Sequence, residues 1–99
     1  MAIKKQYLKS KPVCKVTFSI LAEDAKKVSL VGSFNDWNEK SNAMAKLKSG
    51  DFKIDLNLTP GKEYQFRYLI DNTTWENDWE ADKYAQSDLS AEENSVLVL

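Results

Sequence analysis

Histidine is absent from this chain of 99 residues, and cysteine occurs only once, at Cys14. The chain therefore lacks the commonest general base of enzymes and the commonest zinc ligand. A lone cysteine cannot close a disulfide within the chain, and Cys14 falls in an alternating apolar run that predicts a small buried side chain. We expect no metal site and no cofactor.

Long apolar runs and an excess of one charge are also missing. No segment approaches the roughly 18 apolar residues of a membrane span, and the first residues lack the apolar core of a signal peptide. The formal net charge is −1, whereas a nucleic-acid-binding domain needs a basic field to displace counterions. We therefore expect a cytoplasmic protein that binds neither membrane nor nucleic acid.

Period-two alternation of apolar and polar residues is the main pattern that is present. It runs through 13–21, 52–58 and 64–71, and it is typical of half-buried strands. With shorter apolar segments it gives roughly six to eight strands, which predicts an all-β sandwich, although periodicity alone does not choose this over a small barrel. We expect 13–99 to form a single domain and 1–12 to be a loosely ordered N-terminal segment. The residues expected to be among the most buried are Phe18, Ile54, Leu56, Phe66 and Tyr68.

The stretch VSLVGSFNDW at 28–37 begins as a strand and breaks at Gly32 into a polar turn. Glycine tolerates positive φ, and asparagine and aspartate side chains bond the nearby backbone, so these residue types favour a turn. Trp37 then stands in or just after a loop at the end of a sheet. In that place it either caps the core or offers a flat apolar face to a ligand, and the sequence leaves both interpretations open.

This stretch, together with YQFRYLID at 64–71 and ENSVLV at 93–98, resembles the glycogen-binding or isoamylase early-set module, also called carbohydrate-binding module family 48. The similarity extends from about Lys15 to Leu99. Modules of this family stand at the N-terminus of starch-branching and debranching enzymes and in the β subunit of AMP-activated protein kinase. The resemblance implies an immunoglobulin-like antiparallel β-sandwich that binds linear α-1,4-glucans of the glycogen and starch type.

The resemblance also implies a set of binding residues. Trp37 matches the tryptophan of the family's Gly-Ser-Phe-Asn-x-Trp turn, and Trp75 matches a second tryptophan after one extra loop residue. Arg67 takes the place of a lysine on the preceding strand, and Asn94 matches an asparagine before the last strand. Trp79 stands where many members have proline, and it would be either a third platform or a loop anchor.

The chemistry of these side chains suits a sugar. The apolar C–H face of a glucose ring stacks on an indole, and the hydroxyl rim needs donors and acceptors. Arg67 supplies a planar fork of donors, and Asn94 supplies an amide that both donates and accepts. Two tryptophan platforms at an angle favour a curved α-glucan over flat cellulose.

Three functions remain open from the sequence. The first is non-catalytic glucan binding by a stand-alone module, or by a module acting in trans beside a glucan-active enzyme. The second is a protein-interaction or regulatory domain that docks on such an enzyme or on a kinase-type complex without binding sugar. The third, a glycoside hydrolase, needs two carboxylates across a cleft, whereas the acidic residues of 71–82 are expected on a solvated face. We therefore expect no catalytic residue and no enzyme activity.

Overall fold

The computed structural model describes residues 2–78, 80–86 and 93–99. The strands, in chain order, are β1 (Ala2–Tyr7), β2 (Cys14–Leu21), β3 (Val28–Gly32), β4 (Ala45–Lys46), β5 (Asp51–Leu58), β6 (Glu63–Ile70), β7 (Thr74–Glu76), β8 (Lys83–Gln86) and β9 (Glu93–Val98). A short 3-10 turn, η1 (Ser33–Asn35), follows β3. The described part of the chain contains no helix long and apolar enough to cross a membrane.

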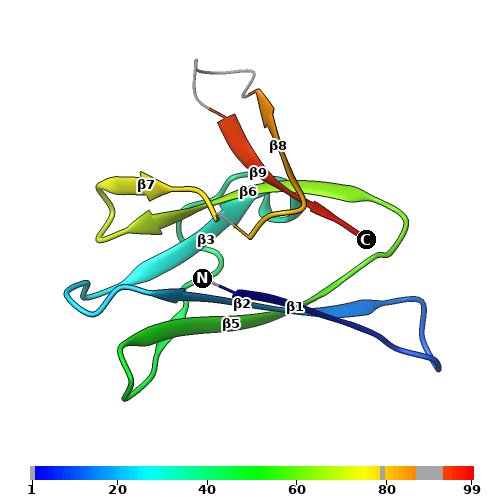
Figure 1. Cartoon of the computed structure of the whole chain (residues 1–99), viewed down its shortest axis with the longest axis horizontal. Helices are drawn as coiled ribbons and strands as arrows, with labels where there is room; N and C mark the ends of the chain where they lie inside the picture. Colours follow the sequence, from blue (N-terminus) through cyan, green and yellow to red (C-terminus); the bar gives the residue numbers. More distant parts are fainter. Residues whose placement is uncertain (1, 79, 87–92) are drawn as a thin grey trace.

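The strands form two antiparallel sheets that lie one above the other (Figure 1). The first sheet has the order β1-β2-β5-β4, and the second has the order β3-β6-β9-β8, with β7 also pairing with β6. β6 is central to the second sheet: β3 runs along one side of it, and β7 and β9 follow one another along the other side. The antiparallel β-sandwich predicted from the strand pattern, with the immunoglobulin-like form that the resemblance implied, is confirmed.

Aromatic side chains fill the space between the sheets. Phe18 of β2 meets Phe66 of β6 edge to face, with ring centroids 5.2 Å apart, and Phe66 meets Tyr68 in the same way at 5.8 Å. All three are fully buried, as predicted. Ile54 and Leu56 are only partly buried, so the prediction that they are among the most buried residues was wrong for these two. The physical reason is that β4 pairs with only two residues of β5, which leaves both side chains near the open edge of the first sheet.

β1 is a strand that the sequence pattern does not reveal. It pairs with β2 along its full length, but most of its side chains are exposed, so no alternation marks it. The Lys5 ammonium of β1 donates to the Asp82 carboxylate (2.7 Å) and to the carbonyl of Val98 (3.0 Å), and the Val98 N–H donates to the same carboxylate (2.7 Å). Burial raises the pKa of Asp82, but the hydrogen bonds from Lys5 and Val98 outweigh burial and hold that pKa below its usual range. These contacts connect the first strand to the last.

A buried polar network fixes Asn77 and Asp78, the two residues that follow β7. The fully buried Asp78 carboxylate accepts a hydrogen bond from the Tyr68 hydroxyl (2.7 Å), and the Asp78 N–H donates to the Ser95 hydroxyl (2.8 Å). The Asn77 side-chain oxygen accepts from both the N–H and the hydroxyl of Ser95 at 2.9 Å. Burial and the neighbouring Asp78 carboxylate raise the pKa of Tyr68. The expectation that the acidic residues of 71–82 are solvated is therefore wrong for Asp78, because this network replaces water around its side chain.

Candidate binding face

The candidate site lies on the outer face of the second sheet, by which we mean the side turned away from the first sheet. Phe66 and Tyr68 of β6 point into the core. Because successive side chains of a strand point to opposite faces, Gln65, Arg67 and Leu69 lie on the outer face. The strand registers align other side chains with these three: Val31 of β3 lies opposite Arg67, Val96 of β9 opposite Gln65, and Trp75 of β7 opposite Leu69.

The turn after β3 holds Trp37 in an uncommon backbone conformation. Asp36 and Trp37 have φ angles of 55° and 59°, in the left-handed region that bulky residues rarely occupy. The Trp37 N–H donates to the Gly32 carbonyl at 2.9 Å, so the turn closes back on the end of β3. Trp37 is 38% exposed. A large part of the indole is therefore open to solvent although its backbone is fixed.

The Asn35 side chain stabilises this turn by bonding backbone groups of β3, as a neighbouring strand would otherwise do. Its Oδ1 accepts from the Gly32 N–H (3.1 Å), and its Nδ2 donates to the Leu30 carbonyl (3.0 Å) and to Asn42 Oδ1 (2.6 Å). The Leu30 N–H in turn donates to the Asn42 carbonyl at 2.9 Å. Asparagine suits this position because one side chain supplies both donors and an acceptor. The asparagine of the motif is thus a structural residue of the turn.

Gly32 and Phe34 connect the turn to the core. A Cβ atom on Gly32 would lie 2.5 Å from the Gln65 carbonyl oxygen and 2.8 Å from the Phe34 ring, so glycine alone fits between β6 and this ring. Phe34 packs against Phe18 with ring centroids 6.2 Å apart. The Ser33 hydroxyl accepts from the Gln65 N–H at 3.1 Å, which extends the pairing of β3 with β6. Phe34 therefore provides the contact of this turn with the core.

Trp75 is presented by the hairpin that joins β6 to β7. Asp71 and Asn72 at its tip have φ angles of 51° and 60°, the pair of positive φ angles that a type I′ turn requires. The Asp71 carboxylate accepts from the backbone N–H groups of Lys27 (3.0 Å) and Lys26 (2.8 Å), and these two hydrogen bonds lower the pKa of Asp71. Trp75 is 40% exposed. The hairpin is therefore anchored to the loop before β3, while its tryptophan stays open.

Arg67 and Asn94 lie in one row across the outer face, since the β6–β9 register continued by one residue puts Asn94 opposite Arg67. Arg67 is partly buried. Asn94 is only 6% exposed, and its Nδ2 donates to Gln65 Oε1 at 2.9 Å. Gln65 therefore belongs to the candidate site, although the sequence did not single it out. Its alternation with Phe66 was the available signal, but its hydrogen bond to Asn94 depends on the register of two distant segments.

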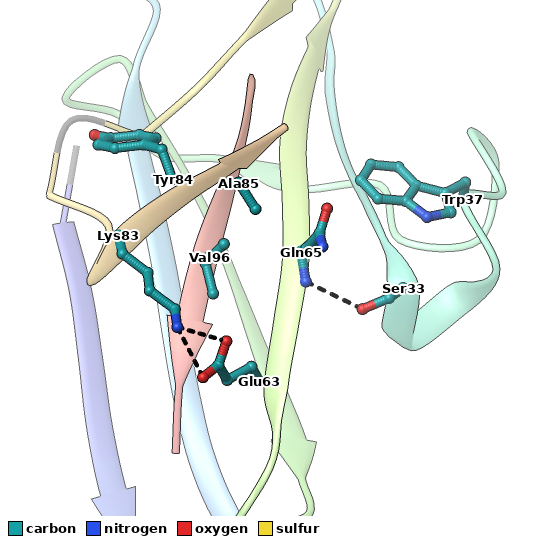
Figure 2. Close-up of a pocket in the computed structure, with 8 residues that line it drawn as sticks. All are labelled: Ser33, Trp37, Glu63, Gln65, Lys83, Tyr84, Ala85 and Val96. Atoms are coloured by element: carbon teal, nitrogen blue, oxygen red, sulfur yellow. Dashed lines mark hydrogen bonds and ion pairs between the residues drawn. The ribbon is translucent and has the colours of Figure 1, made fainter. Parts of the chain in front are cut away.

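The two tryptophans lie beside different rows of the outer face. Trp75 is opposite Leu69, whereas Trp37 lines a hollow together with Gln65 (Figure 2). Residues four apart on a strand are separated by about 13 Å at about 3.4 Å per residue, and Arg67 lies between these two rows. Trp79, the fifth predicted residue, lies outside the described residues. Within the described ranges, no group of three or more cysteine and acidic side chains is arranged to hold a metal ion.

Comparison with known proteins places this sandwich among carbohydrate-binding modules. The family model for carbohydrate-binding module 48, the isoamylase N-terminal domain, matches residues 6–85. The chain therefore belongs to this family, and the resemblance stated from its motifs is confirmed. A curated relative, the 1,4-alpha-glucan branching enzyme GlgB of Bacillus cytotoxicus, is 37% identical over 71 residues, which are 71% of this chain. The chain spans 11% of the length of that relative.

Proposed function

We propose that this chain binds α-1,4-glucan by stacking glucose rings on Trp37 and Trp75, and that it does so without catalysis of its own. The observation that carries the proposal is the exposure of two tryptophans, 38% and 40%, one in the turn after β3 and the other on β7, that flank one outer face. Membership of a carbohydrate-binding family supports a sugar as the ligand. The relative described above is a 1,4-alpha-glucan branching enzyme, which supports a glucan as that sugar.

Arg67 and the Asn94–Gln65 pair provide the polar part of the proposed site. The Arg67 guanidinium donates to sugar hydroxyls from the middle of the face. Asn94 acts mainly by holding Gln65, since its own Nδ2 is engaged at 2.9 Å by the Gln65 carbonyl oxygen. The Gln65 amide nitrogen then remains on the side of the hollow beside Trp37. In this arrangement Asn94 positions Gln65 and does not contact the sugar directly. This follows from the low exposure of Asn94.

The proposed interaction is weak and insensitive to salt. One stacked ring contributes about 1–2 kcal/mol if apolar burial is worth about 25 cal/mol per Å². Two rings and a few hydrogen bonds of about 1 kcal/mol each correspond to a Kd between roughly 10 µM and a few mM. Added salt has little effect because a glucan carries no charge to screen.

Titration of the 15N-labelled protein with maltoheptaose, followed by NMR, tests the proposal. Trp37→Ala and Trp75→Ala should each weaken binding at least tenfold, the equivalent of about 1.4 kcal/mol for one lost platform. Tyr7→Ala is the matched control, because Tyr7 is a 55% exposed aromatic on β1 of the other sheet. If the wild-type protein shows no shifts at millimolar maltoheptaose, the glucan proposal is wrong and docking on a protein partner becomes the better explanation.

We also propose that the module works in the cytoplasm beside a glucan-active enzyme, either in trans or within one chain. The support is the relative in which a matching segment is about a tenth of a branching enzyme. Co-sedimentation with glycogen, in the presence and absence of a purified branching enzyme, measures this. An enzyme that sediments with glycogen equally well without the module contradicts the assignment.

A further inference from the structure

A hollow of about 450 Å³ lies beside Trp37 on the outer face of the second sheet (Figure 2). It runs from Trp37 across β6 and β9 to β8. Its lining includes Trp37, Gln65, Glu63, Lys83, Ala85 and Val96. Figure 2 shows Trp37 on one side of Gln65, with Lys83 and Tyr84 of β8 on the opposite side. A volume of this size is within the range of small-molecule sites, about 300–1,000 Å³.

Most of this hollow lies beside the row that contains Arg67 and Asn94, although Ala85 of its lining pairs with Asn94. Neither of these residues lines it, and Trp75 does not line it either. Gln65 stands between the two regions, because it lines the hollow while its Oε1 accepts from Asn94 at 2.9 Å. A chain that stacks on Trp37 therefore meets the hollow as it continues away from Arg67.

The lining of the hollow has two kinds of surface. Ala85 and Val96 form an apolar floor on the side of Gln65 away from Trp37 (Figure 2), and Val96 is only 1% exposed. Glu63 and Lys83 form an ion pair of 2.9 Å, and their side chains are 51% and 53% exposed. A carboxylate that accepts and an ammonium that donates are thus both within reach of solvent. Since the two charges cancel, the hollow favours a neutral ligand with hydroxyl groups over an anion or a cation.

We propose that this hollow binds further glucose units of the same α-glucan chain, beyond those stacked on Trp37 and Trp75. A glucose unit has an apolar face for Ala85, and it has hydroxyls for the Glu63–Lys83 pair. This inference rests on the proposed glucan binding and extends it. The Glu63–Lys83 ion pair then contacts only long oligosaccharides, so that these bind better than short ones.

The test compares maltotriose with maltoheptaose by isothermal titration calorimetry. For the wild-type protein we expect maltoheptaose to bind more tightly. The double variant Glu63→Gln/Lys83→Met removes the pair, and Ala85→Gln places a longer neutral side chain in the hollow. Each should weaken maltoheptaose binding roughly three- to tenfold, the loss expected for one or two hydrogen bonds. Each should change maltotriose binding less than twofold.

Two control variants separate the site from general effects. Lys15 and Asp55 form an exposed ion pair (3.8 Å) on the other sheet, so Lys15→Met/Asp55→Asn should leave both affinities unchanged. Glu63→Lys/Lys83→Glu keeps the pair in reversed order, and it should retain most of the preference for maltoheptaose. Thermal melting of every variant shows whether the fold is kept.

The possible outcomes distinguish the two proposals. If the wild-type protein binds neither oligosaccharide, glucan binding itself is wrong. If both oligosaccharides bind and the hollow variants keep the wild-type ratio of affinities, the hollow is not a binding region. If the variants weaken maltotriose and maltoheptaose equally, the hollow belongs to the primary site and the proposed extension is wrong.

Discussion

Replacing Trp37 by glycine is expected to leave this protein more stable than replacing it by alanine. Both substitutions remove the indole, so the loss of its contacts is nearly the same in each. The backbone at this position has φ = 59°, which costs an L-amino acid about 1–2 kcal/mol and costs glycine nothing. Glycine has the more flexible unfolded chain, a disadvantage of about 0.5–1 kcal/mol. At the midpoints of these two ranges, the difference should therefore favour Trp37→Gly by about 0.75 kcal/mol.

Trp75 provides the matched comparison, because it is equally exposed at 40% but lies in the extended backbone of β7. Here glycine gains nothing in the folded state, so Trp75→Gly should be less stable than Trp75→Ala by about 0.5–1 kcal/mol. The sign of the glycine–alanine difference thus reverses between the two tryptophans. At about 4–8 °C per kcal/mol for a domain of this size, each difference corresponds to a change in Tm of about 2–8 °C.

Thermal and urea unfolding of the four variants measure both differences. If Trp37→Ala is as stable as Trp37→Gly or more stable, Trp37 does not hold a left-handed backbone in solution. The turn would then present the indole differently, and the placement of this platform would have to be revised. If glycine is the more stable replacement at both positions, the disadvantage assigned to glycine through its flexible unfolded chain is wrong instead.

Three further predictions concern the framework of the face. Gly32→Ala should cost about 1–3 kcal/mol in urea unfolding, because its Cβ would lie 2.5 Å from the Gln65 carbonyl oxygen and 2.8 Å from the Phe34 ring; a neutral result would mean that both the ring and the backbone of β6 move aside freely. Tyr68→Phe should lower the free energy of unfolding by about 1–3 kcal/mol, since the buried Asp78 carboxylate loses a hydrogen-bond donor at 2.7 Å. Unchanged stability would show that another group replaces the Tyr68 hydroxyl as the donor. Asp82 has a lowered pKa in the folded protein, so its stabilising contribution is present above the unfolded pKa of about 4 and is lost as the pH falls below it. Asp82→Asn should therefore flatten the fall in Tm on acidification, and an identical acid profile would contradict this.

The strands that face the core could be predicted from the sequence, whereas most edge strands could not. β5 and β6 alternate apolar and polar residues because one of their faces is buried, and this produces the period-two pattern. β7 and most of β8 are exposed, so burial imposes no alternation on them. The same holds for β1. Their existence depends on pairing with neighbours that only the folded structure identifies.

On the candidate face, too, some features follow from the local sequence and others depend on residues that are distant in the chain. Alternation in β6 was enough to put Arg67 on the outer side. The burial of Asn94 was not predictable, because it depends on a hydrogen bond to Gln65, which lies 29 residues away in the sequence. The burial of Asp78 likewise depends on Tyr68 and Ser95, from two other strands. An acidic residue in a polar segment gives no sign of such partners in the sequence.

Hydrogen-bonded turns at the two ends of β3 hold the backbone that carries each of the two tryptophans. The Trp37 N–H is bonded to Gly32 (2.9 Å), and the hairpin of Trp75 is held by Asp71 (2.8 and 3.0 Å). The proposed glucan binding would therefore require little ordering of these two turns, and no conformational step in them would slow association. With an association rate constant of about 10⁶–10⁷ M⁻¹s⁻¹ and a Kd of about 100 µM, a bound glucan would leave after about 1–10 ms. If glucan binding is as proposed, a module with such short residence times would release and rebind along a polymer many times a second, and an enzyme beside it would stay near its substrate without being held at one place.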